Sequence, residues 1–381
     1  MPGSRRSRGD GPRATPVTVA TPKIIAFLIP DLRGGGAERV ALTLAKAFVG
    51  RGHEVDLVVM EHTGELLDAV PPDVRIVDLG VKRMRSVIAP LVRYLRERRP
   101  DAIQISMWPL TIMGIIAARV SRVPMRVVVS DHVAYSAPFL SSRQLRLLSG
   151  SARLIYPLAD HRVVVSERGA EDLAALTGIA RSRFDVVYNP IDVPRTIAPS
   201  DEAERAWRGP GRRIITTGSL KPQKNHALLL RGFARLHDTD AQLMILGEGP
   251  LRTDLERLAA GLGCADRVAM PGFKVDPWPY LASAEMFVLS SDYEGYPLAL
   301  AEAMHAGLRI VSTDCVSGPS EMLAGGRFGK LVPVRDEGAL AEAIEEGLGL
   351  PHSPELVRGR AESVSGAAVV DRYLDLLVGP R

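Results

Sequence analysis

Cysteine is scarce in this chain of 381 residues, which contains only Cys264 and Cys315. Two cysteines cannot build the disulfide framework of a small secreted domain, and they cannot supply the four ligands of a structural zinc site. Long apolar runs are missing as well, because the stretch at residues 112–118 is far shorter than the roughly 20 residues that span a bilayer. We therefore expect two small buried cysteines and any contact with a membrane at the protein surface only.

The N-terminal tail also lacks the apolar segment of a targeting signal. Residues 1–22 are rich in Arg, Gly, Pro, Ser and Thr, and no apolar segment follows Arg5, Arg6 and Arg8. A secretory signal needs such a segment after its basic residues. We expect residues 1–22 to be a disordered tail and the protein to be cytoplasmic.

Neither sign of charge dominates the whole chain, but its two halves differ. Residues 23–190 contain 23 Lys and Arg against 17 Asp and Glu, whereas residues 191–381 carry a net charge of −5. A chain of this length is long enough to form two domains of about 150–200 residues each. The opposite signs indicate that the two halves face different partners.

Short apolar runs alternate with helical patterns along both halves. In the first half, the runs are at residues 23–30, 55–60, 74–79, 102–105, 125–130 and 161–165, and a helical pattern covers residues 38–49. In the second half, strands are expected at residues 213–217, 242–246, 267–270, 286–289 and 309–312, and helices at 225–237, 251–260 and 298–305. This alternation is typical of parallel sheets covered on both faces. We predict an α/β protein of two doubly wound, Rossmann-like domains, with a cleft between them at the carboxyl ends of both sheets.

Proline marks the boundary between the two series. A polar stretch punctuated by Pro190, Pro194, Pro199 and Pro210 predicts an interdomain linker at residues 191–211. The first domain is then residues 23–190 and the second is residues 212–362. An amphipathic pattern at residues 364–377 predicts a C-terminal helix within residues 363–381 that closes the chain and packs back on the first domain.

A turn with phosphate-binding features follows the first strand of the second half. Residues 217–225 read Thr-Gly-Ser-Leu-Lys-Pro-Gln-Lys-Asn and lead into a helix. The backbone N–H groups of such a turn and the helix dipole suit a diphosphate, and Lys224 adds a positive charge. The alternative is a surface lysine in an ordinary loop between a strand and a helix.

Two weaker candidates follow the next two strands. Gly247 and Glu248 belong to a Gly-Glu-Gly-Pro turn, which either lets a backbone approach a ligand closely or is an ordinary tight turn before a helix. Phe273, in a Pro-Gly-Phe sequence, is placed where a nucleobase would stack or bind the backbone.

The most specific pattern is Tyr-Glu-Gly-Tyr-Pro-Leu-Ala-Leu-Ala-Glu at residues 293–302. Glu294 lies at a strand end, and Glu302 follows eight positions later on a helix, beyond a Gly-Tyr-Pro elbow. Both carboxylates can therefore face one cleft, with helix N-terminal amides between them. Carboxylates accept hydrogen bonds from sugar hydroxyls, and free amides suit phosphate oxygens. The alternative is that each glutamate is a solvated charge at a helix end.

Together these motifs resemble those of the family 4 retaining glycosyltransferases, which have the two-domain GT-B architecture. The resemblance rests on Glu-x7-Glu at 294 and 302, Gln-Lys-Asn at 223–225, Gly-Pro-Ser-Glu at 318–321 and Tyr-Asn-Pro-Ile-Asp at 188–192. It implies an enzyme that takes a hexose or N-acetylhexosamine from a nucleotide-diphosphate sugar, with UDP favoured over GDP. The implied acceptor is a glycan or a lipid-linked sugar of the kind used in polysaccharide biosynthesis.

The same resemblance implies roles for single residues. Lys224 would hold the donor diphosphate, Glu294 would accept hydrogen bonds from the transferred sugar, and Glu302 would hold the ribose hydroxyls. The donor would also lie against the entry of the second-domain helix and the glycine loop of the first domain, which are Gly295, Tyr296, Leu298 and Ala299, and Gly34, Gly35 and Gly36. His132, in Ser-Asp-His after a strand, resembles the acceptor-side polar residue of the family, although a lone histidine is more often structural. His132, Lys224 and Glu294 are thus the catalytic candidates.

One position departs from the family pattern. Members commonly have arginine after the glycine of the first motif, but this chain has Ser219, which offers a hydrogen bond and no charge. Lys221 or an arginine of the first domain would compensate. The departure keeps open a non-catalytic sugar-nucleotide-binding protein with a degenerate site, and a sugar-nucleotide epimerase of the same architecture is a further alternative. A nicotinamide-dependent dehydrogenase is set aside, because residues 34–36 lack the Gly-x-Gly-x-x-Gly spacing.

The sequence indicates neither a metal nor a covalent nucleophile. No Asp-x-Asp cluster stands at a strand end, so we predict no metal ligands and no cofactor besides the nucleotide-sugar co-substrate. No Asp or Glu has a spacing that marks it as a nucleophile. The route that the family implies is attack on the same face as the departing group, with the phosphate oxygen taking the acceptor's proton.

Residues 82–99 are basic, with apolar residues interleaved. A helix of this kind either lies on anionic lipid headgroups or packs its apolar stripe on the sheet and leaves its charges in solvent. The first interpretation predicts a peripheral protein on the inner face of the membrane. A nucleic-acid partner is not expected, because the phosphate-binding features point into a cleft.

Overall fold

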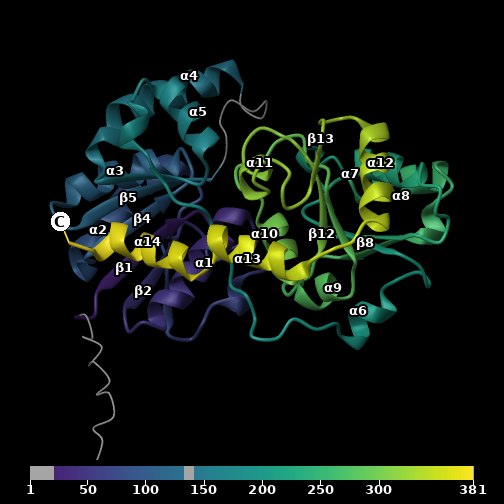
Figure 1. The fold of residues 1–381 in the computed structure, drawn as a ribbon. Helices are drawn as coiled ribbons and strands as arrows, with labels where there is room; N and C mark the ends of the chain where they lie inside the picture. The colour runs from purple at the N-terminus through teal and green to yellow at the C-terminus, as the bar shows by residue number, and fades with distance from the viewer. Residues whose placement is uncertain (1–20, 133–140, 381) are drawn as a thin grey trace, which may run out of the picture.

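The computed structural model describes residues 21–132 and 141–380, and of the predicted tail it describes only the last two residues. Two parallel sheets stand side by side (Figure 1). The first sheet has the strand order β3-β2-β1-β4-β5-β6-β7. Its strands are β1 Ile24–Ile29, β2 Glu54–Val59, β3 Val74–Asp78, β4 Ala102–Ser106, β5 Arg126–Asp131, β6 His161–Val164 and β7 Asp185–Val186.

Helices cover both faces of the first sheet. They are α1 Gly36–Val49, α2 Ile88–Arg98, α3 Leu110–Ser121, α4 Ser142–Ile155 and α5 Glu167–Thr177, with short 3-10 turns η1 Leu67–Ala69, η2 Met84–Ser86, η3 Tyr156–Leu158 and η4 Arg181–Arg183. Val40, Leu44 and Phe48 of α1 pack on one face of the sheet. Leu91 of α2 and Ile115 of α3 belong to the core on the other face.

The second sheet has the strand order β10-β9-β8-β11-β12-β13. Its strands are β8 Arg213–Thr217, β9 Gln242–Leu246, β10 Val268–Gly272, β11 Met286–Leu289, β12 Arg309–Thr313 and β13 Lys330–Val332. Its helices and turns are α7 His226–Ala234, α8 Arg252–Gly261, α9 Trp278–Ala282, α10 Leu298–Ala306, α11 Pro319–Met322, α12 Glu337–Gly349, η5 Pro222–Lys224 and η6 Ala265–Arg267. The predicted α/β architecture of two doubly wound sheets is confirmed. The short edge strands β7 and β13 are missing from the predicted series, because two or three residues show no periodicity.

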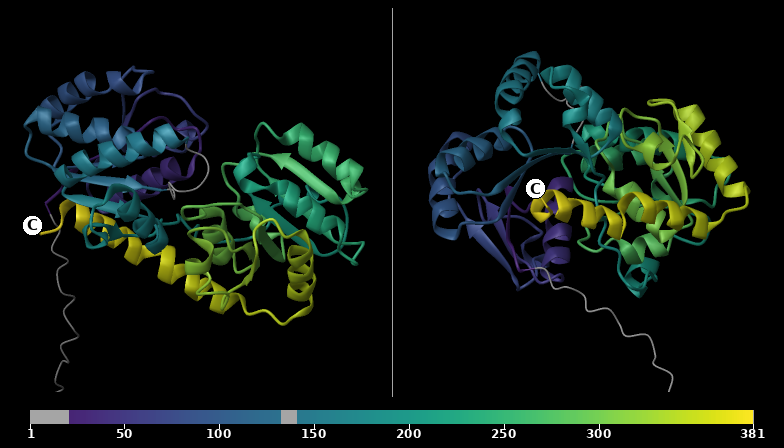
Figure 2. Two further views of the ribbon diagram at one scale, coloured as in Figure 1. Left: turned by 90° about the horizontal axis from the view of Figure 1, so that it is seen from above. Right: turned by 60° about the vertical axis from the view of Figure 1, so that its left-hand side comes forward.

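The C-terminal segment differs from the single predicted helix. It forms two helices, α13 Pro354–Ser365 and α14 Ala367–Val378, which meet at Gly366 and run across both domains (Figures 1 and 2). Ala361 of α13 is buried in the second core, and Tyr373 of α14 is buried in the first. A side chain at Gly366 would collide with the Glu362 backbone and carboxylate, so the break coincides with the residue that has no Cβ.

The predicted linker is not wholly a linker. It contains helix α6, Asp201–Arg205, and Ala203 and Trp207 are buried in the second core. Ile191, Val193, Ile197 and Ala206 also pack against this core, and the polar residues and prolines between them conceal the contact in the sequence. Cys264 and Cys315 are both buried and free, as expected.

Residues 82–99 form η2 and α2, and their apolar side chains face inward. Val87, Leu91, Val92, Tyr94 and Leu95 are buried in the first core. Arg98 pairs with the buried Asp56, and the exposed side chains include Arg93, Arg96 and Arg99. The structure therefore shows the packing of the second interpretation, in which the apolar stripe packs on the sheet, and contact of the exposed arginines with lipid stays a prediction. No helix within residues 21–132 and 141–380 is long and apolar enough to cross a bilayer.

Candidate active site

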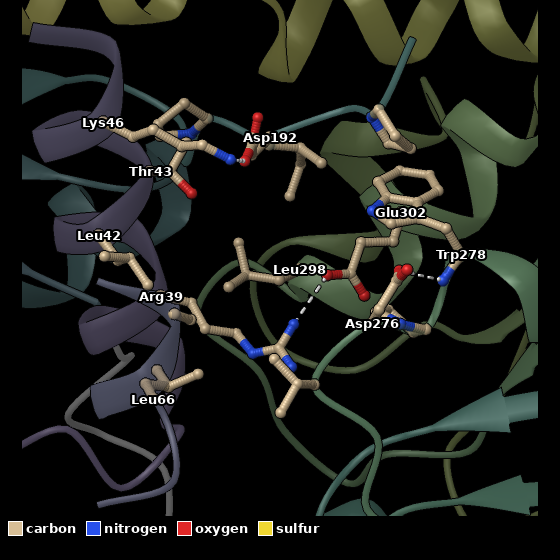
Figure 3. A pocket seen from close by; sticks show the side chains of 16 residues that line it. Arg39, Leu42, Thr43, Lys46, Leu66, Asp192, Asp276, Trp278, Leu298 and Glu302 are labelled. Carbon is tan, nitrogen blue, oxygen red and sulfur yellow. Dashed lines mark hydrogen bonds and ion pairs between the residues drawn. The ribbon is translucent and has the colours of Figure 1, made fainter. Parts of the chain in front are cut away.

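A pocket of about 350 Å³ lies between the two sheets (Figure 3). One wall is helix α1, with Arg39, Leu42, Thr43 and Lys46, and the opposite wall is the second domain. The second-domain wall comprises residues 275–278, Leu298 and Glu302, and residues 190–192 and 194 of the connecting segment close one side. The pocket thus lies where doubly wound sheets place their ligands, in the crevice at the carboxyl ends of the strands.

Glu302 projects into this pocket from helix α10. Its side chain is buried, and burial raises its pKa, while Arg39 opposes that rise. The Arg39 Nη1 atom lies 3.2 Å from Glu302 Oε1, so an arginine of the first domain neutralises a carboxylate of the second (Figure 3). The guanidinium also lies 6.0 Å from the centre of the Phe273 ring. Arg39 is a site residue that the sequence analysis did not assign, although it closes the Gly-Gly-Gly-Ala-Glu-Arg stretch at residues 34–39.

Lys224 and Glu294 meet in the second domain. Lys224 ends η5, and its Nζ atom lies 2.6 Å from Glu294 Oε1. The hydroxyl of Ser291 donates to the same oxygen at 2.6 Å. Glu294 is buried and Lys224 is largely so, with side-chain exposures of 6% and 17%. Two of the three predicted catalytic residues are therefore in contact, and a phosphate would compete with Glu294 for the lysine.

The two predicted glycine turns pack on each other. The Gly218 N–H donates to the Leu246 carbonyl at 3.0 Å, and the Leu220 N–H donates to the Glu248 carbonyl at 2.8 Å. A Cβ at Gly247 would lie 2.0 Å from the Gly218 carbonyl oxygen. The space beside Gly247 where a Cβ would lie is thus filled by the protein's own backbone, and the approach of a ligand to this turn stays a prediction. Ser219 is half-buried in the same turn.

The glycine loop of the first domain faces loops of the second. A Cβ at Gly34 would lie 3.7 Å from the Phe273 ring, and one at Gly36 would lie 3.8 Å from Leu298 Cδ1. A Cβ at Gly35 would collide with Glu38, a buried acid on α1 whose pKa burial raises. Gly34 and Gly36 therefore lie opposite predicted donor-site residues, while Gly35 lies against its own helix.

The entry of α10 divides into a part that faces the pocket and a part that does not. Leu298 begins the helix and lines the pocket, and Ala299 follows it in the first turn, where helical N–H groups have no intrahelical partner. The Tyr296 side chain instead points away, stacking on Tyr188 at 5.2 Å and donating to the Val364 carbonyl at 2.6 Å. Gly295 accepts a hydrogen bond from Ser317. Glu248 pairs with Arg252.

His132 lies directly after β5, and both of its ring nitrogens contact side chains of the first domain. One ring nitrogen lies 2.9 Å from Ser130 Oγ, and the other lies 3.2 Å from Asn189 Oδ1. Burial lowers the pKa of His132 to about 4, so the imidazole is neutral at pH 7. A neutral, doubly held imidazole accepts or orients a hydroxyl better than it supplies charge.

Further contacts join the domains beside the cleft. The Ser166 and Ser317 hydroxyls lie 2.5 Å apart. The Glu321 carboxylate accepts the backbone N–H groups of Glu167 and Arg168 at 3.0 Å each, at the first turn of α5. The described part of the chain brings together no group of three His, Cys, Asp or Glu side chains able to hold a metal ion.

Two family models match the chain, one over each domain. Residues 34–195 match the model described as Glycosyltransferase Family 4, and residues 211–349 match the model described as Glycosyl transferases group 1.

Curated relatives match most of the chain. One is the N-acetylgalactosamine-N,N'-diacetylbacillosaminyl-diphospho-undecaprenol 4-alpha-N-acetylgalactosaminyltransferase of Campylobacter jejuni, 29% identical over 84% of this chain and 89% of its own length. Another is the amylovoran biosynthesis glycosyltransferase AmsD of Erwinia amylovora, 25% identical over 79% of this chain and 83% of its own. Among solved structures, Anabaena HepE in complex with UDP-glucose is similar, with a TM-score of 0.79, 18% identity, and coverage of 93% of this chain and 100% of its own.

Proposed function

The chain belongs to the family 4, group 1 glycosyltransferases and is a glycosyltransferase of the GT-B fold, and from this premise we propose its donor, stereochemistry and acceptor. The donor is a UDP-sugar, which carries a hexose or N-acetylhexosamine. The transfer retains the anomeric configuration. The acceptor is a glycan or a lipid-linked sugar. Membership in the family sets aside the epimerase and the non-catalytic binding protein that the sequence left open.

One observation carries the proposal: Lys224, Glu294 and Glu302 all lie in the second domain beside the start of α10. Lys224 and the α10 amides suit the diphosphate, Glu302 suits the ribose hydroxyls, and Glu294 suits the sugar hydroxyls. The solved structures of Anabaena HepE hold UDP, alone or with glucose, and support the choice of base. The Campylobacter relative, whose name specifies a diphospho-undecaprenol acceptor, supports a lipid-linked one.

In the proposed reaction, the bond between the anomeric carbon and the diphosphate oxygen breaks, and a bond to the acceptor hydroxyl oxygen forms on the same face. The acceptor's proton passes to the departing diphosphate oxygen, so no protein nucleophile is needed. Lys224 and the helix amides stabilise the charge on the leaving diphosphate, and the neutral His132 positions groups on the acceptor side.

Calorimetric titration with UDP and with GDP, in excess EDTA, tests the donor site. We expect the wild-type protein to bind UDP and Lys224→Ala to lose the binding by about tenfold or more, because a charge-assisted contact is removed. Lys330→Ala, which removes an exposed lysine elsewhere in the second domain, should bind like the wild type. Binding of GDP in place of UDP would overturn the choice of base.

Lys224→Ala leaves the buried Glu294 carboxylate without its cation, so thermal unfolding should be recorded on the same sample. Lys224→Arg, which keeps the charge, gives a second variant if alanine prevents folding. Equal UDP binding by the wild type and a folded Lys224→Ala would place the diphosphate elsewhere.

Independence from metal is part of the proposal. Turnover of a UDP-sugar should persist in excess EDTA, because Lys224 and helix amides take the role of a cation on the diphosphate. Loss of turnover in EDTA that Mg²⁺ restores would contradict this.

A further inference from the structure

The motif Tyr-Asn-Pro-Ile-Asp at residues 188–192 stands where the chain first leaves the first domain, and the proposed reaction gives it no role. The Tyr188 ring stacks on Tyr296 of the second domain at 5.2 Å, and the Ile191 N–H donates to the carbonyl of Ser365, the last residue of α13. Asn189 lies between these two contacts and is buried. A carboxamide that is removed from water needs hydrogen-bond partners within the protein.

The partner of Asn189 is the ring of His132. The Asn189 Oδ1 atom lies 3.2 Å from His132 Nδ1, and the Ser130 Oγ atom lies 2.9 Å from His132 Nε2. Asn189, His132 and Ser130 are 2%, 8% and 0% exposed. Because water is largely excluded from all three side chains, the hydrogen bonds among them determine the orientation of the imidazole ring.

These contacts select one tautomer of His132. A carboxamide oxygen accepts hydrogen bonds and does not donate them, so the contact with Asn189 Oδ1 requires a proton on Nδ1. Burial holds the ring neutral, and a neutral imidazole has only one N–H group. Nε2 is then the unprotonated nitrogen and accepts from the Ser130 hydroxyl. In the opposite tautomer, the Asn189 oxygen would face a nitrogen lone pair.

We propose that Asn189 is a positioning residue for the transfer reaction, and that its side-chain oxygen fixes His132 as the Nδ1–H tautomer with Nε2 as the hydrogen-bond acceptor. In one respect the inference rests on the proposed function, because His132 is assigned there to the acceptor side. Asn189 acts through His132 and does not itself contact a substrate. The motif that opens the interdomain segment thereby gains a role in the cleft.

Ser130 leaves Nε2 able to serve a substrate. The Ser130 hydroxyl also lies within hydrogen-bond distance of the Tyr373 phenol oxygen of α14, so its single proton has a second acceptor. When an acceptor hydroxyl donates to Nε2, the Ser130 proton turns to Tyr373. The histidine orients the hydroxyl without taking its proton, which still passes to the departing diphosphate oxygen.

Nitrogen NMR of the full chain, labelled with ¹⁵N at histidine, measures the tautomer directly, because protonated and unprotonated ring nitrogens have different chemical shifts. The chain has eight histidines, and His132→Gln identifies the His132 signals. We expect the wild type at pH 7 to have a protonated Nδ1 and an unprotonated Nε2. Asn189→Leu, which removes the oxygen at similar size, should give the other tautomer or a mixture of both. The buried His305, whose Nε2 lies 2.9 Å from Ser365 Oγ, is an internal reference that should not change.

Turnover separates a positioning role from a purely structural one. We expect Asn189→Leu to lower the turnover of UDP-glucose or UDP-N-acetylglucosamine by about tenfold or more, because the ring is no longer held in one tautomer. The affinity for UDP, measured by calorimetry, should stay that of the wild type, because Asn189 does not line the pocket.

Asn189→Asp is the conservative variant, since it keeps the oxygen and adds a negative charge. The charge favours the imidazolium and raises the pKa of His132 above its wild-type value of about 4. Turnover should therefore be restored at high pH and fall as the pH decreases through the raised pKa, whereas the wild type keeps its turnover to lower pH. The neighbouring carboxylate of Asp131, which accepts from the Tyr156 hydroxyl, is the same in both proteins.

The matched control is Thr177→Val at the end of α5, which also removes a buried polar group of the first domain. The Thr177 hydroxyl donates to the Leu173 carbonyl at 2.7 Å. We expect this variant to lose stability but to keep the tautomer of His132 and the turnover. An Nε2–H tautomer in the wild type, or a folded Asn189→Leu protein with the wild-type tautomer or the wild-type turnover, would overturn the proposal. If Asn189→Leu does not fold, a wild-type pH profile of Asn189→Asp would overturn it.

The same samples separate this inference from the proposed donor site. The tautomer is measured without a ligand, so a wild type that binds neither UDP nor GDP but has the Nδ1–H tautomer contradicts the donor assignment alone. A wild type that binds UDP but has the Nε2–H tautomer contradicts the role of Asn189 alone. Circular dichroism of each variant verifies folding.

Discussion

At the scale of single residues, the ion pair between Arg39 and Glu302 links the two domains and affects the charge of a buried carboxylate. Burial raises the pKa of Glu302 and favours its neutral form, while the positive charge of Arg39 opposes this. Ribose hydroxyls need an ionised carboxylate to donate to. Arg39 therefore favours the ionised form of Glu302, which the proposed contact with a nucleotide ribose uses.

Replacing Arg39 should shift the pH below which nucleotide affinity falls to a higher value. In Arg39→Gln the pKa of Glu302 rises further, so the carboxylate is protonated earlier as the pH falls. UDP affinity should then fall by up to about tenfold per pH unit below that pKa. Calorimetric titrations at a series of pH values measure this.

Arg33→Gln is the control for the Arg39 variant, since Arg33 is an exposed arginine just before helix α1 that pairs with the nearby Asp31. Its affinity should follow the wild-type pH profile. An Arg39→Gln protein with the wild-type profile would show that Glu302 does not need the arginine to remain charged.

At the scale of elements, the turns after β8 and β9 form one packed unit. Each turn hydrogen-bonds to the other, and Gly247 leaves just the space that the Gly218 carbonyl occupies. The turn that carries Ser219 and leads to Lys224 is therefore positioned by its neighbour. We expect loss of the β9 turn to displace the turn that carries Ser219, and with it the proposed diphosphate site.

Gly247→Ala should destabilise the protein by about 2–4 kcal/mol, because its Cβ would force two buried backbone segments apart. Urea unfolding followed by circular dichroism measures the change. The control is Gly261→Ala near the end of α8, where a Cβ meets nothing within 4 Å. That substitution should be neutral or stabilising by up to about 1 kcal/mol. Equal stability of both variants would contradict the packed-turn account.

At the scale of the whole molecule, polar contacts hold the two domains together across the cleft. Arg39 meets Glu302, Ser166 meets Ser317, and Glu321 accepts two N–H groups of α5. The chain crosses between the domains twice, and the crossings meet where the Ile191 N–H donates to the Ser365 carbonyl at 3.0 Å. Closure thus rests on these polar contacts and on apolar contacts in which Val165 packs in the second core and Leu298 against the first, beside the two chain crossings.

Removing the Glu321 carboxylate should favour an open cleft. Glu321→Ala loses two charge-assisted hydrogen bonds, which at a half-exposed position contribute about 1 kcal/mol to closure, or about a fivefold shift of the equilibrium. Small-angle X-ray scattering should show a larger radius of gyration for the nucleotide-free variant. Glu337→Ala, which removes an exposed ion pair within the second domain, should scatter like the wild type. Identical curves for Glu321→Ala and the wild type would contradict the role of this contact.

Local patterns were sufficient for much of the architecture. The bounds predicted for β8, β9 and β11 are those observed, because each is a short segment with consecutive apolar residues between turns. Lys224, Glu294 and Glu302 were predicted as one donor site from motifs that follow strands β8 and β11, and this site stays a prediction. The direction of the apolar residues in 82–99 was not predictable, since an amphipathic helix has the same periodicity on a sheet and on a membrane.

The sequence by itself determined the fold class and most of the strand series, because these depend on the periodicity of short segments. Only the tertiary structure decided that Arg39 neutralises Glu302, that Lys224 pairs with Glu294, and that the Gly218 backbone fills the space beside Gly247. It also decided that Asn189 lies against the ring of His132. These features depend on contacts between residues far apart in the chain, and no local pattern encodes which distant side chain or backbone segment comes to lie opposite.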